Sequence, residues 1–190
     1  EMGMTPQDLS DKFSTAFAES WKKLDIRFDG FIRTTEPRHF TAVHELYRRI
    51  RERGFIYLGE YSGQYCVSCE AYVAEGQTVC PDCGRPTEFM TEESYFFKLS
   101  EFQQKLIDFY ENNPTFVIPQ SRMNEIVSFV KGGLRDFSIS RTSFQWGIPI
   151  PDDDKHIFYV WFDALIGYLS GIGFGSDDKR FNSLWPADVQ

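Results

Sequence analysis

All four cysteines of this chain lie in one short stretch, CVSCEAYVAEGQTVCPDCG, residues 66–84. They form two Cys-x-x-Cys pairs with ten residues between them. Each such turn directs two sulfurs to one place, and two turns together supply the four thiolates of a closed tetrahedral zinc site. We therefore predict that Cys66, Cys69, Cys80 and Cys83 bind one structural zinc ion.

Two other chemistries of paired cysteines fit this stretch less well. A thioredoxin-like redox site needs one pair at a strand–helix junction, whereas this chain has two pairs that face each other. A catalytic zinc site needs an open position for water, which four thiolates do not leave. Gly84 directly follows Cys83, where a metal-binding turn needs tight backbone geometry.

The composition indicates a globular protein that does not bind nucleic acid by charge alone. Of the 190 residues, 42% are hydrophobic and 25% are charged, and the net charge is −8. Such a surface repels a phosphate backbone unless its basic residues are segregated. The one basic cluster, RRIRER at residues 48–53, falls in a helical pattern, and we interpret it as a solvated helix face.

The most apolar stretch, IFYVWFDALIGYLSGIGF at residues 157–174, is interrupted by Asp163 and three glycines. We interpret it as buried core and expect no membrane association. No secretory signal opens the chain, and its start at Glu1 is typical of a piece of a longer protein. A reducing cytoplasm is the expected location, where paired cysteines favour metal binding over disulfides.

The remaining segments alternate between helical and strand-like patterns. We expect helices at residues 5–24, 37–53, 100–112 and 119–131, and strands at 55–65, 87–99 and 156–162, the last followed directly by a short helix from residue 163. Thr5 with Asp8, and Ser100 with Gln103, have the spacing of capping boxes. Asp163 is expected to cap the last helix. These elements predict an α/β protein in which a small zinc-binding module interrupts a larger domain.

Several motifs occur in one order and together resemble methionyl-tRNA synthetase, a class I aminoacyl-tRNA synthetase. They are FIRTTEPRH, the cysteine stretch with GRP, YFFKLS, LRDFSISR, WGIPIP, YVWFDALIGYL and LWPADV. The resemblance covers nearly the whole chain. It implies a partial Rossmann-like catalytic domain, residues 1–54 and 137–190, interrupted by a zinc-knuckle connective-peptide insertion, residues 55–136.

The resemblance also implies substrates and the residues that bind them. The family activates L-methionine with ATP and Mg²⁺ to methionyl-adenylate and then charges tRNA(Met). Matched onto this sequence, Trp161 faces the methionine side chain, and Ala164, Leu165 and Tyr168 close around the thioether. Arg141 resembles the family's arginine near the substrate carboxylate. Phe137 stands near the same pocket, where some relatives have tryptophan.

The ATP-binding parts of the family are missing from these 190 residues. Neither a HIGH-like stretch nor a KMSKS-like loop occurs in the sequence. We therefore assign no catalytic residue and expect this piece to be inactive alone, although the full enzyme is a methionine–tRNA ligase. The alternative is a free-standing zinc-ribbon module that docks on protein or nucleic acid, but such a module has no need of VWFDALIGYL or DFSISR.

Overall fold

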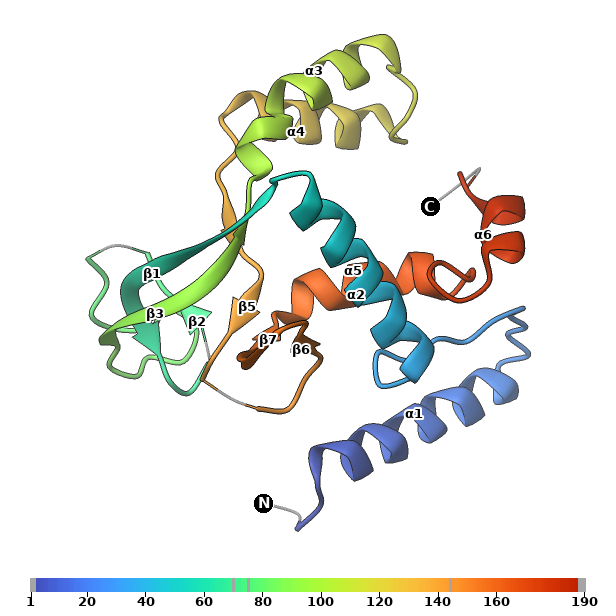
Figure 1. The fold of residues 1–190 in the computed structure, drawn as a ribbon, viewed down its shortest axis with the longest axis horizontal. Helices are drawn as coiled ribbons and strands as arrows, with labels where there is room; N and C mark the ends of the chain where they lie inside the picture. The colour runs from blue at the N-terminus through green and yellow to red at the C-terminus, as the bar shows by residue number, and fades with distance from the viewer. Residues whose placement is uncertain (1–2, 70, 75, 144, 188–190) are drawn as a thin grey trace. The chain divides into compact units, whose positions relative to one another are not determined.

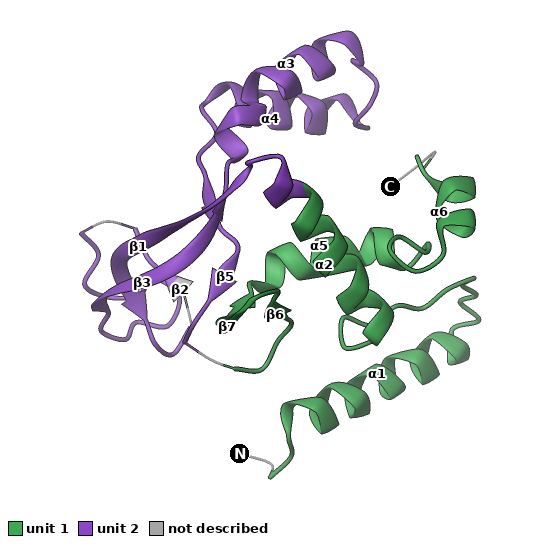
Figure 2. Cartoon of the chain, viewed as in Figure 1, with its two compact units in different colours: residues 1–49, 144–190 green, residues 50–143 purple. Residues whose placement is uncertain are grey.

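The computed structural model describes residues 3–69, 71–74, 76–143 and 145–187. The chain divides into two units: unit 1 comprises residues 1–49 and 144–190, and unit 2 comprises residues 50–143 (Figure 2). Unit 1 therefore contains both ends of the sequence, and unit 2 is a continuous segment between them. Residues 70, 75, 188 and 189, which belong to motifs quoted above, lie outside the described residues.

Unit 1 is mostly helical (Figure 1). Its elements are α1 (Pro6–Lys23), most of α2 (Pro37–Glu52), β6 (Pro149–Ile150), β7 (Asp153–Phe158), α5 (Val160–Ser170) and α6 (Asp178–Leu184). β6 and β7 pair antiparallel, with Pro149 opposite Ile157. The helices expected at 5–24 and 37–53 are confirmed, with ends within two residues of the prediction.

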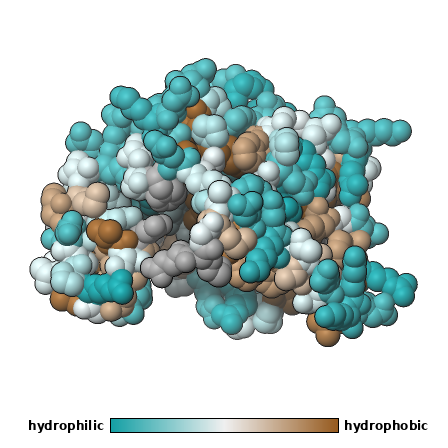
Figure 3. Space-filling view, turned by 90° about the horizontal axis from the view of Figure 1, so that it is seen from below, coloured by the Kyte–Doolittle hydropathy of each residue, from teal (hydrophilic) through white to brown (hydrophobic). Residues whose placement is uncertain are grey.

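Helix α1 begins with the predicted capping box. The Thr5 hydroxyl accepts a hydrogen bond from the Asp8 backbone N–H, and the Asp8 carboxylate accepts one from the Thr5 backbone N–H. The apolar side chains of α1 are not buried, however: Phe13 and Phe17 are more than half exposed. Hydrophobic side chains also reach the surface in several separate places on the face drawn in Figure 3.

The core of unit 1 forms where α2 packs against the β7–α5 segment. His39, Ala42, Val43 and Tyr47 are the buried residues of α2. The ring of Tyr47 meets that of Phe158 edge-on, with centroids 5.2 Å apart. On the outer side of α2, Arg48 and Arg49 form ion pairs with Glu45, so the basic cluster is a solvated, ion-paired helix face, as the sequence indicated.

Unit 2 combines an antiparallel sheet with a pair of helices (Figure 1). Its elements are β1 (Ile56–Cys66), β2 (Ala71–Tyr72), β3 (Glu88–Phe97), the 3-10 helix η1 (Leu99–Phe102), α3 (Gln103–Asn112), α4 (Gln120–Lys131), β4 (Phe137–Ser138) and β5 (Ser140–Arg141). The four-stranded sheet has the order β2-β1-β3-β4. β1 and β3 pair from Ile56 with Phe97 to Tyr65 with Glu88, so the cysteine stretch forms the tip of a long hairpin.

Three predictions of local structure are wrong: the end of the strand at 156–162, the Asp163 cap and the Ser100–Gln103 capping box. The strand expected at 156–162 ends at Phe158, and helix α5 begins at Val160, with Tyr159 as its N-cap and Asp163 in the first turn. A short continuous apolar run fits a strand and a buried helix equally well, which is why the boundary was misplaced. Ser100 and Gln103 form no capping box, because both side chains bind the segment after α4: Ser100 donates to Asp136, and Gln103 accepts from the Leu134 N–H.

Candidate metal centre and candidate binding face

The sulfurs of Cys66, Cys69, Cys80 and Cys83 lie within 4.8 Å of one another. The Cys66 and Cys83 sulfurs are 3.5 Å apart, and those of Cys69 and Cys80 are 3.8 Å apart. All four cysteines are free thiols. Four sulfurs about 2.3 Å from a central zinc ion are about 3.8 Å from one another. The spacing therefore fits a tetrahedral zinc site.

Two tight turns bring these sulfurs together. The first follows the end of β1, where Cys66 pairs with Ala71 of β2. In the second, the Gly84 N–H donates to the Cys80 carbonyl, and the Cys80 N–H donates to the Arg85 carbonyl. Gly84 has a φ of +69°, a conformation that glycine adopts at little cost. This is the backbone role that the sequence predicted for it.

The tip of the hairpin has no hydrophobic core of its own. In the described part of residues 66–87, only Cys66 and Cys80 are buried, each 1% exposed, whereas Val67 and Val79 are more than half exposed. Crowding of the thiols, led by the hydrogen bond with Cys83, raises the pKa of Cys69 to about 12. The sulfur cluster thus contains both of the residues that are buried in the described part of the tip.

The residues predicted to contact methionine divide between the two units. Trp161, Ala164, Leu165 and Tyr168 all lie on α5 in unit 1. From the sequence we expected Trp161 on a strand end, where it need not share a face with Tyr168. Because both belong to one helix, the spacing of four and three residues places Trp161, Leu165 and Tyr168 on a single face. We call these three side chains the α5 stripe; they are 63%, 60% and 61% exposed.

Arg141 and Phe137 belong to unit 2. Phe137 opens β4 opposite Phe97, and the two rings are 5.7 Å apart. Arg141 lies on β5 and is 8% exposed. Its Nη1 donates to the Ser138 hydroxyl at 2.7 Å and to the Ser140 carbonyl at 2.9 Å. The guanidinium is therefore held in a defined position by Ser138 of β4 and Ser140 of its own strand.

Burial shifts two ionisable groups of unit 1: His39, which was assigned no role from the sequence, and Asp163, which was expected to cap the last helix. His39 of α2 is fully buried, and its Nδ1 lies 2.8 Å from the Ser170 hydroxyl of α5. Burial lowers the pKa of His39, although a hydrogen bond with the Asp163 backbone opposes this shift. Burial also raises the pKa of Asp163 to about 6. Asp163 thus lies half-buried in the first turn of α5, and Tyr159 occupies the N-cap position that we predicted for Asp163.

The raised pKa of Asp163 predicts that Asp163→Asn stabilises the chain at neutral pH. A carboxyl whose folded pKa lies above its unfolded value of 3.8 destabilises the fold once ionised, so stability falls as the pH rises from about 4 to about 6. The gain at pH 7.5 is at most about 3 kcal/mol, and smaller after solvent screening; at pH 4 no gain is expected. Thermal unfolding at both pH values measures it, with the exposed Asp154→Asn as control. Equal gains at both pH values would refute the assignment.

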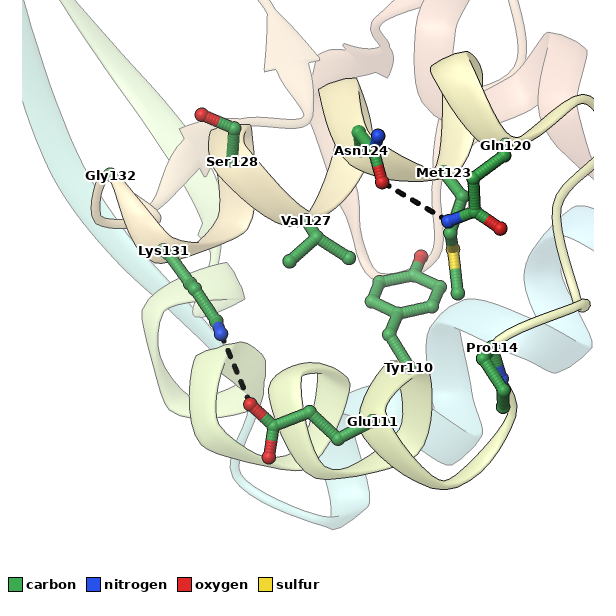
Figure 4. Close-up of a pocket in the computed structure, with 10 residues that line it drawn as sticks. All are labelled: Tyr110, Glu111, Pro114, Gln120, Met123, Asn124, Val127, Ser128, Lys131 and Gly132. Atoms are coloured by element: carbon green, nitrogen blue, oxygen red, sulfur yellow. Dashed lines mark hydrogen bonds and ion pairs between the residues drawn. The ribbon is translucent and has the colours of Figure 1, made fainter.

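A hollow of about 650 Å³ lies between α3 and α4 (Figure 4). The Tyr110 ring points from α3 toward α4, and the Glu111–Lys131 ion pair, 3.0 Å long, closes one end. Met123 and Val127 supply apolar walls from α4. None of the residues predicted to bind metal or substrate lines this hollow.

Comparison with known proteins identifies the family of this chain. The family model for class I tRNA synthetases (M) matches residues 1–88 and 83–190. The methionine–tRNA ligase of Caldanaerobacter subterraneus subsp. tengcongensis is 46% identical over the full length of this chain, which covers 30% of that protein. That of Thermotoga maritima is 44% identical, again over the full chain and 31% of its own length. The chain thus spans about a third of the curated relatives it matches. None of the described helices is long and apolar enough to cross a membrane.

Solved structures agree with these relatives. Mycobacterium tuberculosis methionyl-tRNA synthetase in complex with methionyl-adenylate superposes with a TM-score of 0.87 at 43% identity. The match covers 98% of this chain and 38% of that one. The apo form of the same enzyme gives a TM-score of 0.81 at 44% identity over 96% of this chain. The fold is therefore the α/β fold of class I synthetases, with the cysteine cluster on the hairpin of unit 2.

Proposed function

Because this chain belongs to the class I methionyl-tRNA synthetase family, we propose that it forms part of an enzyme that activates L-methionine with ATP and Mg²⁺ and charges tRNA(Met). The observation that carries this proposal is the superposition over 98% of the chain on an enzyme solved with methionyl-adenylate. A free-standing zinc-ribbon module, the alternative, is not favoured, because the match also includes all of unit 1. We place the enzyme in the cytoplasm, where reduced thiols remain available for metal.

We assign the α5 stripe to the side chain of methionine. Trp161 and Tyr168 offer aromatic faces and edges, and Leu165 lies between them on the same helix face. A thioether is polarizable and makes favourable contacts with aromatic rings. Ala164, half-buried beside the stripe, has a side chain small enough to leave room for the substrate. All three stripe residues are exposed within this chain. A ligand can therefore reach them without displacing side chains of the hydrophobic core.

Arg141 is assigned to the carboxylate of methionine, and Phe137 to the neighbourhood of the same pocket. A guanidinium presents N–H donors in a planar fork that matches a carboxylate. Anchoring by Ser138 and Ser140 fixes the direction of that fork before substrate arrives. Such pre-organisation lowers the entropy cost of binding.

Zinc bound by Cys66, Cys69, Cys80 and Cys83 has a structural role in this proposal. Four thiolates leave no coordination position for water or substrate, so the metal stabilises the tip of the hairpin and takes no part in the chemistry. We accordingly assign residues 55–136 to an inserted connective peptide and residues 1–54 and 137–190 to the catalytic domain.

The isolated 190-residue chain is expected to show no adenylate formation. The HIGH-like and KMSKS-like motifs that stabilise the reacting phosphate are not in its sequence, and without such groups most of the transition-state stabilisation is lost. Methionine-dependent ATP–pyrophosphate exchange should therefore stay at the level of a blank without protein. The enzyme extended to the full length of its relatives serves as the positive control. Exchange by the short chain at a rate close to that of the extended enzyme would overturn this expectation.

A further inference from the structure

Strand β3 places two polar side chains on the buried face of unit 2. Glu92 and Ser94 are two residues apart and so point to the same side of the strand; they are 9% and 1% exposed. Glu93, between them, is exposed. A carboxylate that is buried to this degree needs hydrogen-bond donors to remain charged.

The donors come from the segment that follows Arg141. One oxygen of Glu92, Oε1, accepts hydrogen bonds from the Thr142 N–H at 2.6 Å, the Thr142 hydroxyl at 2.7 Å and the Ser143 N–H at 3.2 Å. Hydrogen bonds to an ionised acceptor are roughly twice as strong as neutral ones. Glu92 therefore ties the chain to β3 immediately after Arg141.

A second attachment lies immediately before Arg141. The Ser94 hydroxyl is 2.5 Å from that of Ser138 and 3.1 Å from that of Ser140. The Ser140 hydroxyl also accepts from the Tyr95 N–H at 2.8 Å. Together with the Glu92 bonds, these contacts hold residues 138–143 against β3 on both sides of Arg141.

The phenol of Tyr72 is affected by the charges of both Glu92 and Arg141. Its hydroxyl is buried without a hydrogen-bond partner in the described part of the chain. Burial raises the pKa of Tyr72, the negative charge of Glu92 raises it further, and the positive charge of Arg141 lowers it. Both charges are thus within electrostatic reach of one phenol.

We propose that Glu92 is a positioning residue that fixes residues 138–143 so that the Arg141 guanidinium is pre-oriented for the carboxylate of methionine. The inference rests on the function proposed above. Displacement of a binding group by about 1 Å can cost about 100-fold in rate or affinity. Glu92→Gln keeps the size of the side chain but loses the charge that strengthens its three hydrogen bonds.

The test uses the full-length enzyme and compares methionine with L-methioninol, which has the same side chain and amine but no carboxylate. In ATP–pyrophosphate exchange, Glu92→Gln should raise the KM for methionine about tenfold, the difference between charge-assisted and neutral hydrogen bonds. The inhibition constant of methioninol should stay within about twofold, because Arg141 has no carboxylate to bind there. Glu93→Gln, the same charge change on the exposed face, should alter neither constant.

Equal shifts in both constants would mean that Glu92 is merely structural, and unchanged constants would mean that it does not position Arg141; either result overturns the proposal. If Glu92→Gln does not fold, Thr142→Val decides the matter, since it removes one donor from an exposed residue. This variant should raise the KM for methionine about threefold and leave methioninol inhibition unchanged; an unchanged KM overturns the proposal. Failure of the proposed function itself is distinct, because the wild-type enzyme would then show no methionine-dependent exchange.

Discussion

Cys80→Ser is expected to abolish zinc binding and to unfold the tip of the β1–β3 hairpin. Cys80 is one of the two buried residues in the described part of 66–87, so the tip has no apolar core to replace the metal. Structural zinc contributes about 10–16 kcal/mol of apparent binding free energy in small zinc-finger peptides. Metal analysis should give one zinc ion per wild-type chain and less than about 0.1 in the variant. Amide hydrogen exchange at residues 66–87 should rise to unprotected rates.

Ser68→Ala is the matched control, because Ser68 lies between Cys66 and Cys69 but is exposed. This variant should keep its zinc and its protected amides. The prediction extends to the wild-type chain after treatment with a chelator, which should reproduce the Cys80→Ser exchange pattern. A Cys80→Ser chain that retains one zinc ion, or that loses zinc without any change in exchange, would contradict a structural metal site.

Trp161→Ala in the full-length enzyme is expected to raise the KM for methionine about 100-fold. The indole is the largest side chain of the α5 stripe, and aromatic anchors of binding sites commonly contribute 2 kcal/mol or more. The thioether loses its aromatic contact as well. Because Trp161 is 63% exposed, its removal should cost the fold little, so the effect should appear in binding and not in the unfolding temperature.

Val160→Ala controls for the loss of apolar surface, since Val160 precedes Trp161 on α5 and is also more than half exposed. The Val160 side chain lies about 100° around the helix axis from that of Trp161. The Val160→Ala variant should therefore leave the KM for methionine within twofold. Trp161→Phe should fall between the two, because it retains an aromatic face. An unchanged KM for methionine in the Trp161→Ala enzyme would contradict the assignment of α5 to the methionine site.

Sequence patterns predicted local structure correctly where the folded chain brings no competing partner to the side chains concerned. The Thr5–Asp8 capping box formed because both partners lie within one turn of α1. The same spacing at Ser100 and Gln103 failed, because Asp136 and Leu134, more than thirty residues away, offer these side chains stronger or additional bonds. Only the folded chain brings those competitors into reach, so the sequence alone could not predict the outcome.

The α5 boundary illustrates a second limit of sequence patterns. Continuous apolar residues from Ile157 to Phe162 fit a strand that is buried on both faces, yet the chain turns at Tyr159 and continues as a helix. A helix, unlike a strand end, places Trp161 and Tyr168 on one face. The start of the helix lies only three residues earlier than predicted, at Val160. This difference decides which side chains share a helix face.

The candidate site was predictable where residue type and spacing were sufficient. Two Cys-x-x-Cys turns predicted the sulfur cluster without any tertiary information. Glu92 escaped notice because an acid in a strand usually faces solvent; its alternation with Ser94 and Phe96, all buried, was the available signal. Asp163 and His39 could not be paired from the sequence, since α2 and α5 are more than a hundred residues apart.

The most direct test of the assigned methionine site is the position of the thioether atom of the bound substrate. Selenium marks this atom when selenomethionine replaces methionine. Crystals of the full-length enzyme, produced with ordinary methionine and soaked with selenomethionine, should show one strong anomalous selenium peak about 5 Å from the Trp161 ring, at the distance favoured for such contacts. A peak remote from the α5 stripe, in crystals that bind the ligand, would contradict the assignment of this segment to the methionine pocket.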